Sequence, residues 1–425
     1  MKIDIKYEDT YSLNELIRWE FMNSHQNVTI EYITEFITER FNKAATYLGV
    51  HQNQEFSDSC IEIKIIMGSP SDDGSRAYFD IVNFKEGSKQ FNFKLYAEVL
   101  LEIIRSENFS VIDTILIHEL VHMIDYKEII KAQHVIKNKY YQERSRDNSA
   151  FSVKRYRHLF LLKIITHFRD EGIATLVEFI AGDIDKKLSS TDDALSEFHK
   201  IIETTITYIY PNNPDANQKY NYYRKTITRA YNIGAGVVLK CLIKKHSDIP
   251  DLNNLENSLN TSKPIKFKLD SCLVDVIKSL TVFDIIQFAF DKEWLYEKIF
   301  KITSDYAESL DQVTGFFIML ERIQQQKDRG YFITMMEFLL KNPMSLCMIN
   351  QAYHDKCNFE GAPDEVINNV DKLYQYLQQN PANEVAIWAL SYFYSKHDLI
   401  SDNIDYFGFI DDHEVLKTAL VILMS

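Results

Sequence analysis

The stretch Thr114–Tyr126, T-I-L-I-H-E-L-V-H-M-I-D-Y, contains the motif H-E-x-x-H. On a helix, residues four apart lie on one face, so the imidazoles of His118 and His122 can point at one metal ion. Glu119 follows the first histidine and can reach a water bound to that metal. The stretch therefore predicts a zinc-binding helix, and the alternative is a helix with two incidental histidines.

The residues around this motif support a helix. Ser110 is a predicted N-cap, with Asp113 three residues later as an acidic variant of the capping box. The helix is expected to run from about Val111 and to bury a broad apolar face, which is made of Ile115, Leu116, Leu120, Met123 and Ile124.

A second segment, residues 159–181, is predicted to be an apolar helix with a carboxylate in its middle. An unpaired buried carboxylate is costly, so a Glu that faces inward from such a helix needs a cation or a partner. Glu171 is therefore the expected third protein ligand, which leaves the fourth zinc position to water. Gly172 and Ala174 beside it would let two helices pack closely around the metal.

Two further carboxylates lie one or two helical turns from predicted ligands. Asp125 follows His122 by three residues and shares its helix face, so it could hold a ligand imidazole from behind. A surface or capping carboxylate is the alternative for Asp125. Glu178, two turns after Glu171, has the same candidate role. His167, one turn before Glu171, is interpreted as an ordinary polar residue.

Three segments, taken in order, resemble a known family. The pattern is similar to that of the gluzincin zinc metallopeptidases, and within them to the aminopeptidase N-type enzymes. The resemblance covers roughly residues 60–245. It rests on His118-Glu119-x-x-His122, then Asp170-Glu171-Gly172-Ile173-Ala174 with Glu178 four residues further, then Tyr231-Asn232-Ile233-Gly234-Ala235.

This resemblance implies a zinc peptidase in which Tyr231 donates a hydrogen bond to the oxyanion of the tetrahedral intermediate. The chain departs from the aminopeptidase pattern in two places. The gap between His122 and Glu171 is longer, and the G-x-M-E-N segment that binds a free amino terminus in that family is missing. The resemblance therefore favours an endopeptidase.

Composition and charge narrow the class of protein. The 425 residues are 46% apolar with only 12 Gly and 8 Pro, which is typical of long helices rather than of a loop-rich chain. The net charge of −14 argues against a general nucleic-acid binder. The five cysteines are scattered without a C-x-x-C pair, so neither a disulfide framework nor a cysteine zinc site is expected.

The beginning of the chain bears on its location. Residues 1–6 carry charges where a signal peptide needs an apolar run, and no stretch approaches a membrane-spanning length. A cytoplasmic location is expected, and export without a cleaved signal peptide stays open. The expected partner is a protein or peptide substrate, and the helical C-terminal region is a second candidate surface for a protein partner. Nucleic acid is not expected.

The predicted fold class is α+β, predominantly helical, with a small sheet in a zincin-like catalytic domain. Alternation of Ile61, Ile63 and Ile65 with charged residues predicts one strand. A second strand is expected over 77–84 and a helix over 91–105. The predicted organisation is N-terminal helices over 1–50, the zincin-like domain over 51–246, a linker over 247–268, a helical region over 269–356 and a small helical domain over 365–425.

The strands before the motif have a functional and a structural interpretation. Zinc peptidases commonly place a sheet edge beside the metal, where an extended substrate pairs by β-augmentation. A hairpin that only covers the helix is the alternative.

The C-terminal segment 365–425 resembles a small bacterial helical domain of unknown function, whose hallmark is S-P-x-D-L-I-P-D followed by G-x-x-D-D. The clustered acids suggest a metal site, and helix caps and turn carboxylates are the simpler interpretation. The match rests on Asp398-Leu399-Ile400-Ser401-Asp402 and Gly408-Phe409-Ile410-Asp411-Asp412, with Lys396 and Ser401 in place of the hallmark prolines.

The favoured hypothesis is a zinc metallopeptidase in which His118, His122 and Glu171 hold Zn²⁺. Glu119 then acts as the general base that activates the water. Two alternatives stay open. One is a helical binding or scaffold protein with a vestigial metal site. The other is a zinc hydrolase of a non-peptide substrate, since H-E-x-x-H specifies an activated water and not its target.

Overall fold

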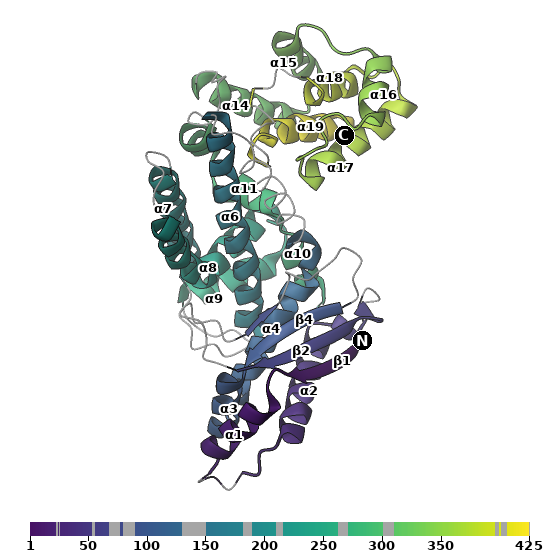
Figure 1. The fold of residues 1–425 in the computed structure, drawn as a ribbon. Coiled ribbons are helices and arrows are strands. Elements are labelled where there is room, and N and C mark those ends of the chain that lie inside the picture. The colour runs from purple at the N-terminus through teal and green to yellow at the C-terminus, as the bar shows by residue number, and fades with distance from the viewer. Residues whose placement is uncertain are drawn as a thin grey trace. The chain divides into compact units, whose positions relative to one another are not determined.

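The structure is a computed structural model. It describes residues 1–22, 24, 26–52, 56–67, 77–79, 90–129, 150–181, 189–209, 216–261, 271–300, 310–395, 399–400 and 406–424. The chain divides into two compact units (Figure 1). Unit 1 is Met1–Lys137 with Leu161–Ile285, and unit 2 is Asn138–Phe160 with Ile286–Ser425. The predicted α+β, predominantly helical class is confirmed, because one small sheet accompanies many helices.

Unit 1 contains a four-stranded sheet with the order β1-β2-β4-β3. Strands β1 (Lys2–Tyr7), β2 (Cys60–Ile66) and β4 (Gln90–Tyr96) run parallel, and β3 (Ala77–Phe79) pairs antiparallel with β4 at the edge. The predicted alternation in β2 is confirmed, since its odd-numbered isoleucines are buried. The strand expected over 77–84 is described only at 77–79.

One predicted helix begins with a strand instead. The sequence led us to expect a helix over 91–105, but β4 occupies its first part and α3 (Ala97–Ser106) begins only after Tyr96. Phe91, Phe93 and Leu95 are buried on one face of β4. This period of two is typical of a strand. The segment forms a strand rather than a helix because it pairs with β2 on one side and with β3 on the other.

The helices of unit 1 include the two predicted before residue 50 and the long apolar helix predicted over 159–181. Residues 161–181 of α6 and 282–285 of α11 belong to unit 1. The helices with residues in unit 1, besides α3, are α1 (Thr10–Glu20), α2 (Ile30–Tyr47), η1 (Val50–Gln52), α4 (Phe109–Ile124), α6 (Ala150–Ala181), α7 (Thr191–Ile209), α8 (Ala216–Lys245), α9 (Pro250–Thr261), α10 (Ser271–Lys278) and α11 (Val282–Ala289).

Local structure in unit 1 differs from the sequence-based expectation in two places. Helix α4 begins at Phe109, so Ser110 lies inside the helix and is not its N-cap. Asp113, the other half of the expected capping box, forms ion pairs with Lys43 and Arg40 instead. The described part of the segment predicted as a linker, 247–268, forms α9, whose three leucines are buried because they follow helical spacing.

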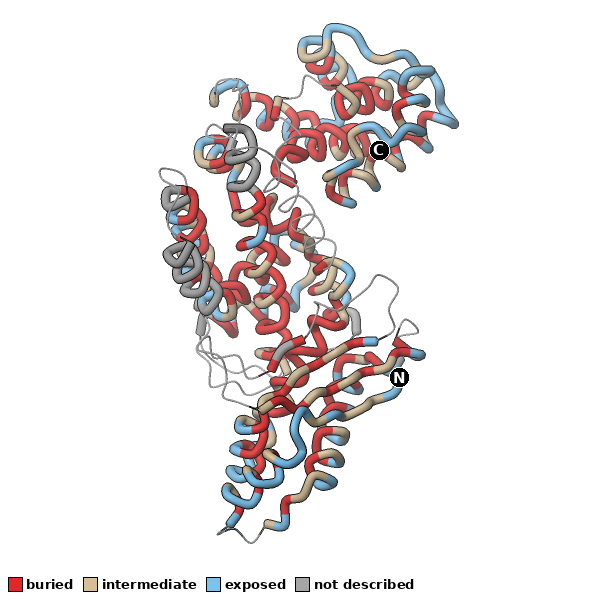
Figure 2. Tube along the Cα trace, viewed as in Figure 1, coloured by how far each residue is buried: buried red, intermediate tan, exposed pale blue. Residues whose placement is uncertain are grey.

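Unit 2 is helical in its described residues, and most residues of α18 and α19 are buried (Figure 2). Helices α14, α17 and α18 pack against α19. Because α14 precedes residue 357 and α19 follows residue 364, contacts cross the boundary between the predicted regions 269–356 and 365–425. The bounds are α12 (Lys292–Leu295), the π-helix η3 (Tyr296–Phe300), α14 (Leu310–Gln326), α15 (Arg329–Leu340), α16 (Leu346–His354), α17 (Asp364–Gln379), α18 (Glu384–Phe393) and α19 (Ile410–Leu423).

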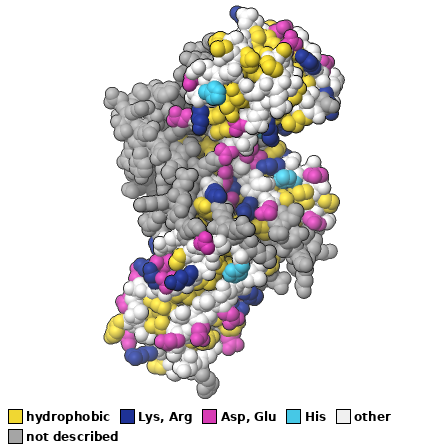
Figure 3. All heavy atoms as spheres, turned by 90° about the vertical axis from the view of Figure 1, so that its right-hand side faces the viewer, with side chains coloured by type: hydrophobic (Ala, Val, Ile, Leu, Met, Phe, Trp, Pro, Cys, Tyr) yellow, Lys and Arg dark blue, Asp and Glu magenta, His cyan; other side chains and the backbone are white. Residues whose placement is uncertain are grey.

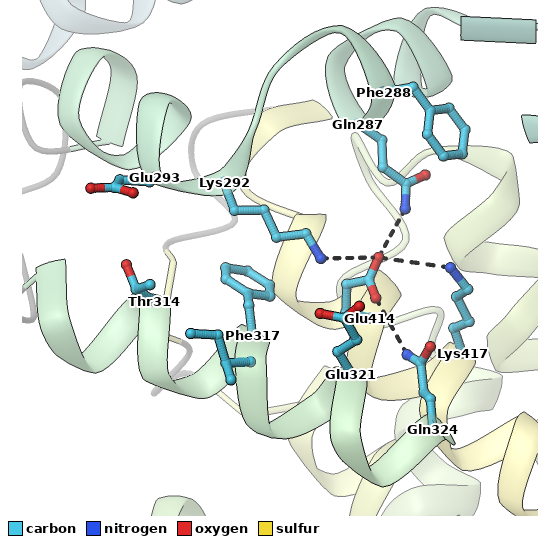
Figure 4. A pocket seen from close by; sticks show the side chains of 11 residues that line it. Gln287, Phe288, Lys292, Glu293, Thr314, Phe317, Glu321, Gln324, Glu414 and Lys417 are labelled. Atoms are coloured by element: carbon cyan, nitrogen blue, oxygen red, sulfur yellow. Dashed lines mark hydrogen bonds and ion pairs between the residues drawn. The ribbon is translucent and has the colours of Figure 1, made fainter. Parts of the chain in front are cut away.

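A cavity of about 460 Å³ in unit 2 surrounds the side chain of Glu414 (Figure 4). Gln287 donates a hydrogen bond of 2.9 Å to this carboxylate, and the Lys292 ammonium lies 3.3 Å from it. The Lys292 ammonium also lies 4.3 Å from the centre of the Phe317 ring. The Glu414 carboxylate in this cavity is therefore already engaged by its neighbours.

The surface of the described residues carries both signs of charge on the face drawn in Figure 3. Acidic, basic and apolar side chains all occur on this face. Among the described helices, none combines the length and the apolar character that crossing a membrane requires.

Candidate metal centre

Three side chains from two helices of unit 1 converge at one point. The Nε2 atom of His118 lies 3.1 Å from Glu171 Oε2 and 3.3 Å from His122 Nε2. The third distance, from His122 Nε2 to Glu171 Oε2, is 3.6 Å. Ligands bonded to zinc at about 2.0–2.1 Å in a tetrahedral arrangement lie about 3.3 Å apart. The spacing therefore fits three corners of a tetrahedron around one ion.

The neighbouring helices α4 and α6 explain this convergence. The four-residue spacing puts His118 and His122 on one face of α4, as the sequence predicts, and α6 supplies Glu171. Both histidines are 8% exposed. The group is thus removed from bulk water. A cation interacts more strongly with charged side chains in such a buried place than in water.

The carboxylates and imidazoles of the group together favour a positive charge between them. Burial alone lowers the pKa of His118, but the carboxylates of Glu171 and Glu178 outweigh burial and raise that pKa to about 10. Burial raises the pKa of Glu171, yet His122 and His118 outweigh it and hold this pKa well below its ordinary value of 4.5. Positive charge is therefore favoured between these side chains, and a divalent ion supplies it without a proton.

Glu178 lies behind one of the histidines. Its Oε2 atom is 3.3 Å from His118 Nδ1, on the side of the ring away from Glu171. A carboxylate in this position holds the proton on Nδ1 and leaves the lone pair of Nε2 for a metal. Glu178 is buried and comes from α6, two turns after Glu171.

Glu119 is buried next to the three converging side chains without belonging to them. Burial raises the pKa of Glu119, while His118 and His122 oppose that rise. The backbone N–H of Phe79, in the edge strand β3, donates a hydrogen bond to this carboxylate. A carboxylate with a raised pKa beside a metal group can take a proton from water and pass it on.

Tyr231 stands on α8 beside the group. Its ring centre lies 5.8 Å from that of His118, with an angle of 31° between the ring planes. A tight crossing of α6 and α8 brings it there: a Cβ atom built on Gly172 would lie 2.5 Å from the backbone of Gly234. Only glycine allows two helices to approach so closely.

Asp125 pairs with Arg169 and not with a ligand imidazole. Its carboxylate accepts two hydrogen bonds from the guanidinium of Arg169, one of them 3.0 Å long from Nη2. Among the described residues, Asp125 forms no hydrogen bond with a ligand imidazole. The physical reason is that Arg169 is fully buried and needs a counter-charge. The signal that could have found it was a lone arginine in an apolar helix.

His167 lies close to the group but outside it. Its Nδ1 atom is 3.9 Å from Glu171 Oε1, which is too long for a hydrogen bond. Its Nε2 atom is buried without a hydrogen-bond partner. His167 is thus beside the second oxygen of Glu171, away from the oxygen that faces the two histidines.

Asp411, one of the acids of the C-terminal segment, accepts hydrogen bonds from groups of its own unit. Asp411 Oδ2 accepts hydrogen bonds from the hydroxyl of Tyr392, at 2.7 Å, and from the backbone N–H of Ile400, at 3.0 Å. Asp398 and Asp402 lie outside the described residues. Within the described ranges, the group of His118, His122 and Glu171 is the one set of such side chains close enough to hold a metal ion.

Comparisons with known proteins do not identify a family for this chain. No known protein family, curated protein or solved structure gives a significant match to this chain. The fold and the site define a predominantly helical α+β protein with a buried His–His–Glu group that could bind a metal ion.

Proposed function

We propose that this protein is a zinc-dependent metallopeptidase of the gluzincin type that cleaves peptide bonds within a protein or peptide. The observation that carries the proposal is the convergence of His118, His122 and Glu171 within 4.8 Å, with the buried carboxylate of Glu119 beside them. Two imidazoles and one carboxylate are a ligand set of catalytic zinc sites, which leave one position for water or substrate.

Each side chain near the metal group has a separate role in the proposed reaction. When bound, zinc supplies a Lewis acid that polarises the scissile carbonyl and lowers the pKa of a water. Glu119 takes the proton from the attacking water and delivers it to the leaving nitrogen. Glu178 keeps the proton of His118 on Nδ1, so that Nε2 can act as a ligand. The Tyr231 hydroxyl donates a hydrogen bond to the oxyanion.

The sheet edge supports a peptide substrate. Strand β3 ends the sheet and packs against α4, the helix that bears the two histidines. An extended chain can add to such an edge by backbone hydrogen bonds, which brings its peptide bonds next to Glu119. The lack of a G-x-M-E-N segment favours cleavage within a chain over removal of its first residue.

Metal content and activity test this proposal together. Protein purified without added metal should contain about one zinc per chain, as a single three-ligand site requires. His118→Ala and Glu171→Ala should lose the zinc, while His246→Ala, which removes a histidine of unit 1 outside the group, should keep it. Glu119→Gln should keep zinc and fold but lose a factor of about 10²–10⁴ in hydrolysis of an internally quenched peptide blocked at both ends.

Three results would contradict the proposal. Zinc retained in both His118→Ala and Glu171→Ala would place the metal elsewhere. A zinc-loaded protein that leaves a diverse peptide library intact would not be a peptidase. Cleavage that requires a free amino terminus would replace the endopeptidase with an aminopeptidase.

A further inference from the structure

The guanidinium of Arg169 joins the two helices that carry the metal group. It donates two hydrogen bonds to Asp125, which ends α4 three residues after His122. It donates another, of 2.8 Å, to Asp170, the residue just before Glu171 on α6. A fourth, of 2.7 Å from Nε, goes to the backbone carbonyl of Leu280. One side chain thus contacts Asp170, which precedes the ligand Glu171 on α6, and Asp125, about one turn after the ligand His122 at the end of α4.

Burial makes these contacts obligatory. Arg169 has no exposed surface, and Asp125 and Asp170 are also buried. An arginine guanidinium stays charged in proteins, and the carboxylates of Asp125 and Asp170 supply the opposite charge here. A buried charge that loses its partners is strongly destabilising, so the guanidinium holds its carboxylates in place.

We propose that Arg169 is a positioning residue for the metal centre, which fixes how far α4 and α6 stand apart where His122 and Glu171 face each other. The proposal rests on the metal site of the proposed function and is independent of whether the bound metal cleaves peptides. The planar fork of arginine matters, because its donors lie in fixed directions and reach Asp125 and Asp170 at once. Lysine offers the charge without this geometry.

Stability alone does not account for such a cluster. Buried ion clusters replaced by apolar residues of similar volume often leave a protein as stable or more so, so a buried arginine is weak evidence for a role in stability. Placement next to the ligands on both helices is instead what positioning requires. Residues that orient metal ligands typically change metal affinity by about 10–100-fold when they are mutated.

The test measures Co²⁺ binding to the full chain, freed of metal, by chelator competition and by the visible absorption of bound Co²⁺, which reports ligand geometry. Arg169→Lys and Asp125→Asn should each weaken Co²⁺ binding about 10–100-fold and shift its absorption bands. Asp125→Asn keeps an acceptor oxygen, so it serves as the milder variant if Arg169→Lys does not fold.

A matched control separates positioning from stability. Leu13→Ala removes a buried side chain from α1 of the same unit, which packs against α3, and should lower the melting temperature without changing Co²⁺ affinity or spectrum. Wild-type affinity and bands in Arg169→Lys and Asp125→Asn would overturn the inference. So would losses in affinity that follow melting temperature as they do in Leu13→Ala.

Hydrolysis is measured separately on the same proteins. A wild-type chain that binds Co²⁺ but cleaves no peptide contradicts the proposed function alone, and the affinity comparison still decides the role of Arg169.

Discussion

At the scale of single residues, the proposed role of Tyr231 rests on its place beside the metal group. Its ring centre lies 5.8 Å from that of His118. It is partly exposed, whereas the following turn of α8, with Gly234 and Ala235, is buried against neighbouring helices. A phenol at the rim of a buried group suits an oxyanion donor.

Replacing Tyr231 by Phe tests this role. The ring keeps its place while the hydroxyl is lost, so kcat should fall by about 10², at the lower end for an oxyanion donor because zinc shares that charge. KM, zinc content and melting temperature should change little. Tyr47→Phe, at the end of α2, is the control and should retain wild-type kinetics. An unchanged kcat in Tyr231→Phe would make this tyrosine a packing residue.

The residues of the site could be predicted from sequence to the extent that they depend on local spacing. The four-residue interval placed His118 and His122 on one helix face, and the cost of a buried carboxylate pointed to Glu171. The pairing of Asp125 with Arg169 could not be predicted in this way. Which side chain of α6 lies opposite the end of α4 depends on how the two helices are rotated against each other, which no local pattern records.

At the scale of elements, the crossing of α6 and α8 sets the position of both Glu171 and Tyr231. Gly172 and Gly234 meet there backbone to backbone, so neither helix can take a side chain at this point. The small residues were visible in the sequence. Strand β4 was missed because its apolar residues lie next to those of α3, and the two periods run together.

Gly172→Ala should therefore destabilise unit 1. The new Cβ atom would lie 2.5 Å from the carbonyl of Gly234, and the helices must move apart at a cost of about 1–3 kcal/mol or more. Gly315→Ala, in α14, is the matched control: nothing lies within 4 Å of its Cβ position, so it should stabilise by about 0.5–1 kcal/mol. Urea unfolding measures both variants. Equal effects of the two substitutions would contradict the close crossing.

At the scale of the whole molecule, composition predicted the fold class but not where its parts begin. Few Gly and Pro residues correctly indicated long helices. The segment 247–268, which is rich in Asn, Ser and Pro, predicts a linker, yet Leu252, Leu255 and Leu259 form a buried face of α9 within it. Polar residues and turn formers dominate the average over such a segment, whereas burial is decided by the spacing of a few leucines.

The stability of the whole chain depends on pH, and we expect the buried carboxylate of Glu414 to make a measurable contribution to that dependence. Burial raises the pKa of Glu414, but Lys292 and Lys417 outweigh it and lower the pKa from 4.5 to about 2. A carboxylate with a lowered pKa adds stability that is present above its unfolded value near 4.5 and is lost as pH falls through about 2. This difference in pKa is worth at most about 3 kcal/mol.

Comparison of Glu414→Gln with the wild type isolates this contribution, because the net charge of −14 affects both proteins almost equally. The wild type should be more stable by a constant amount between pH 7 and about 5, and the advantage should shrink steadily from pH 4.5 toward pH 2. Urea unfolding at each pH measures it, with Glu337→Gln, at an exposed position of α15, as the control. If the advantage at pH 2.5 equals that at pH 7, the amide has disturbed packing in the cavity, and the ion pairs with Lys292 and Lys417 contribute nothing measurable to unit 2.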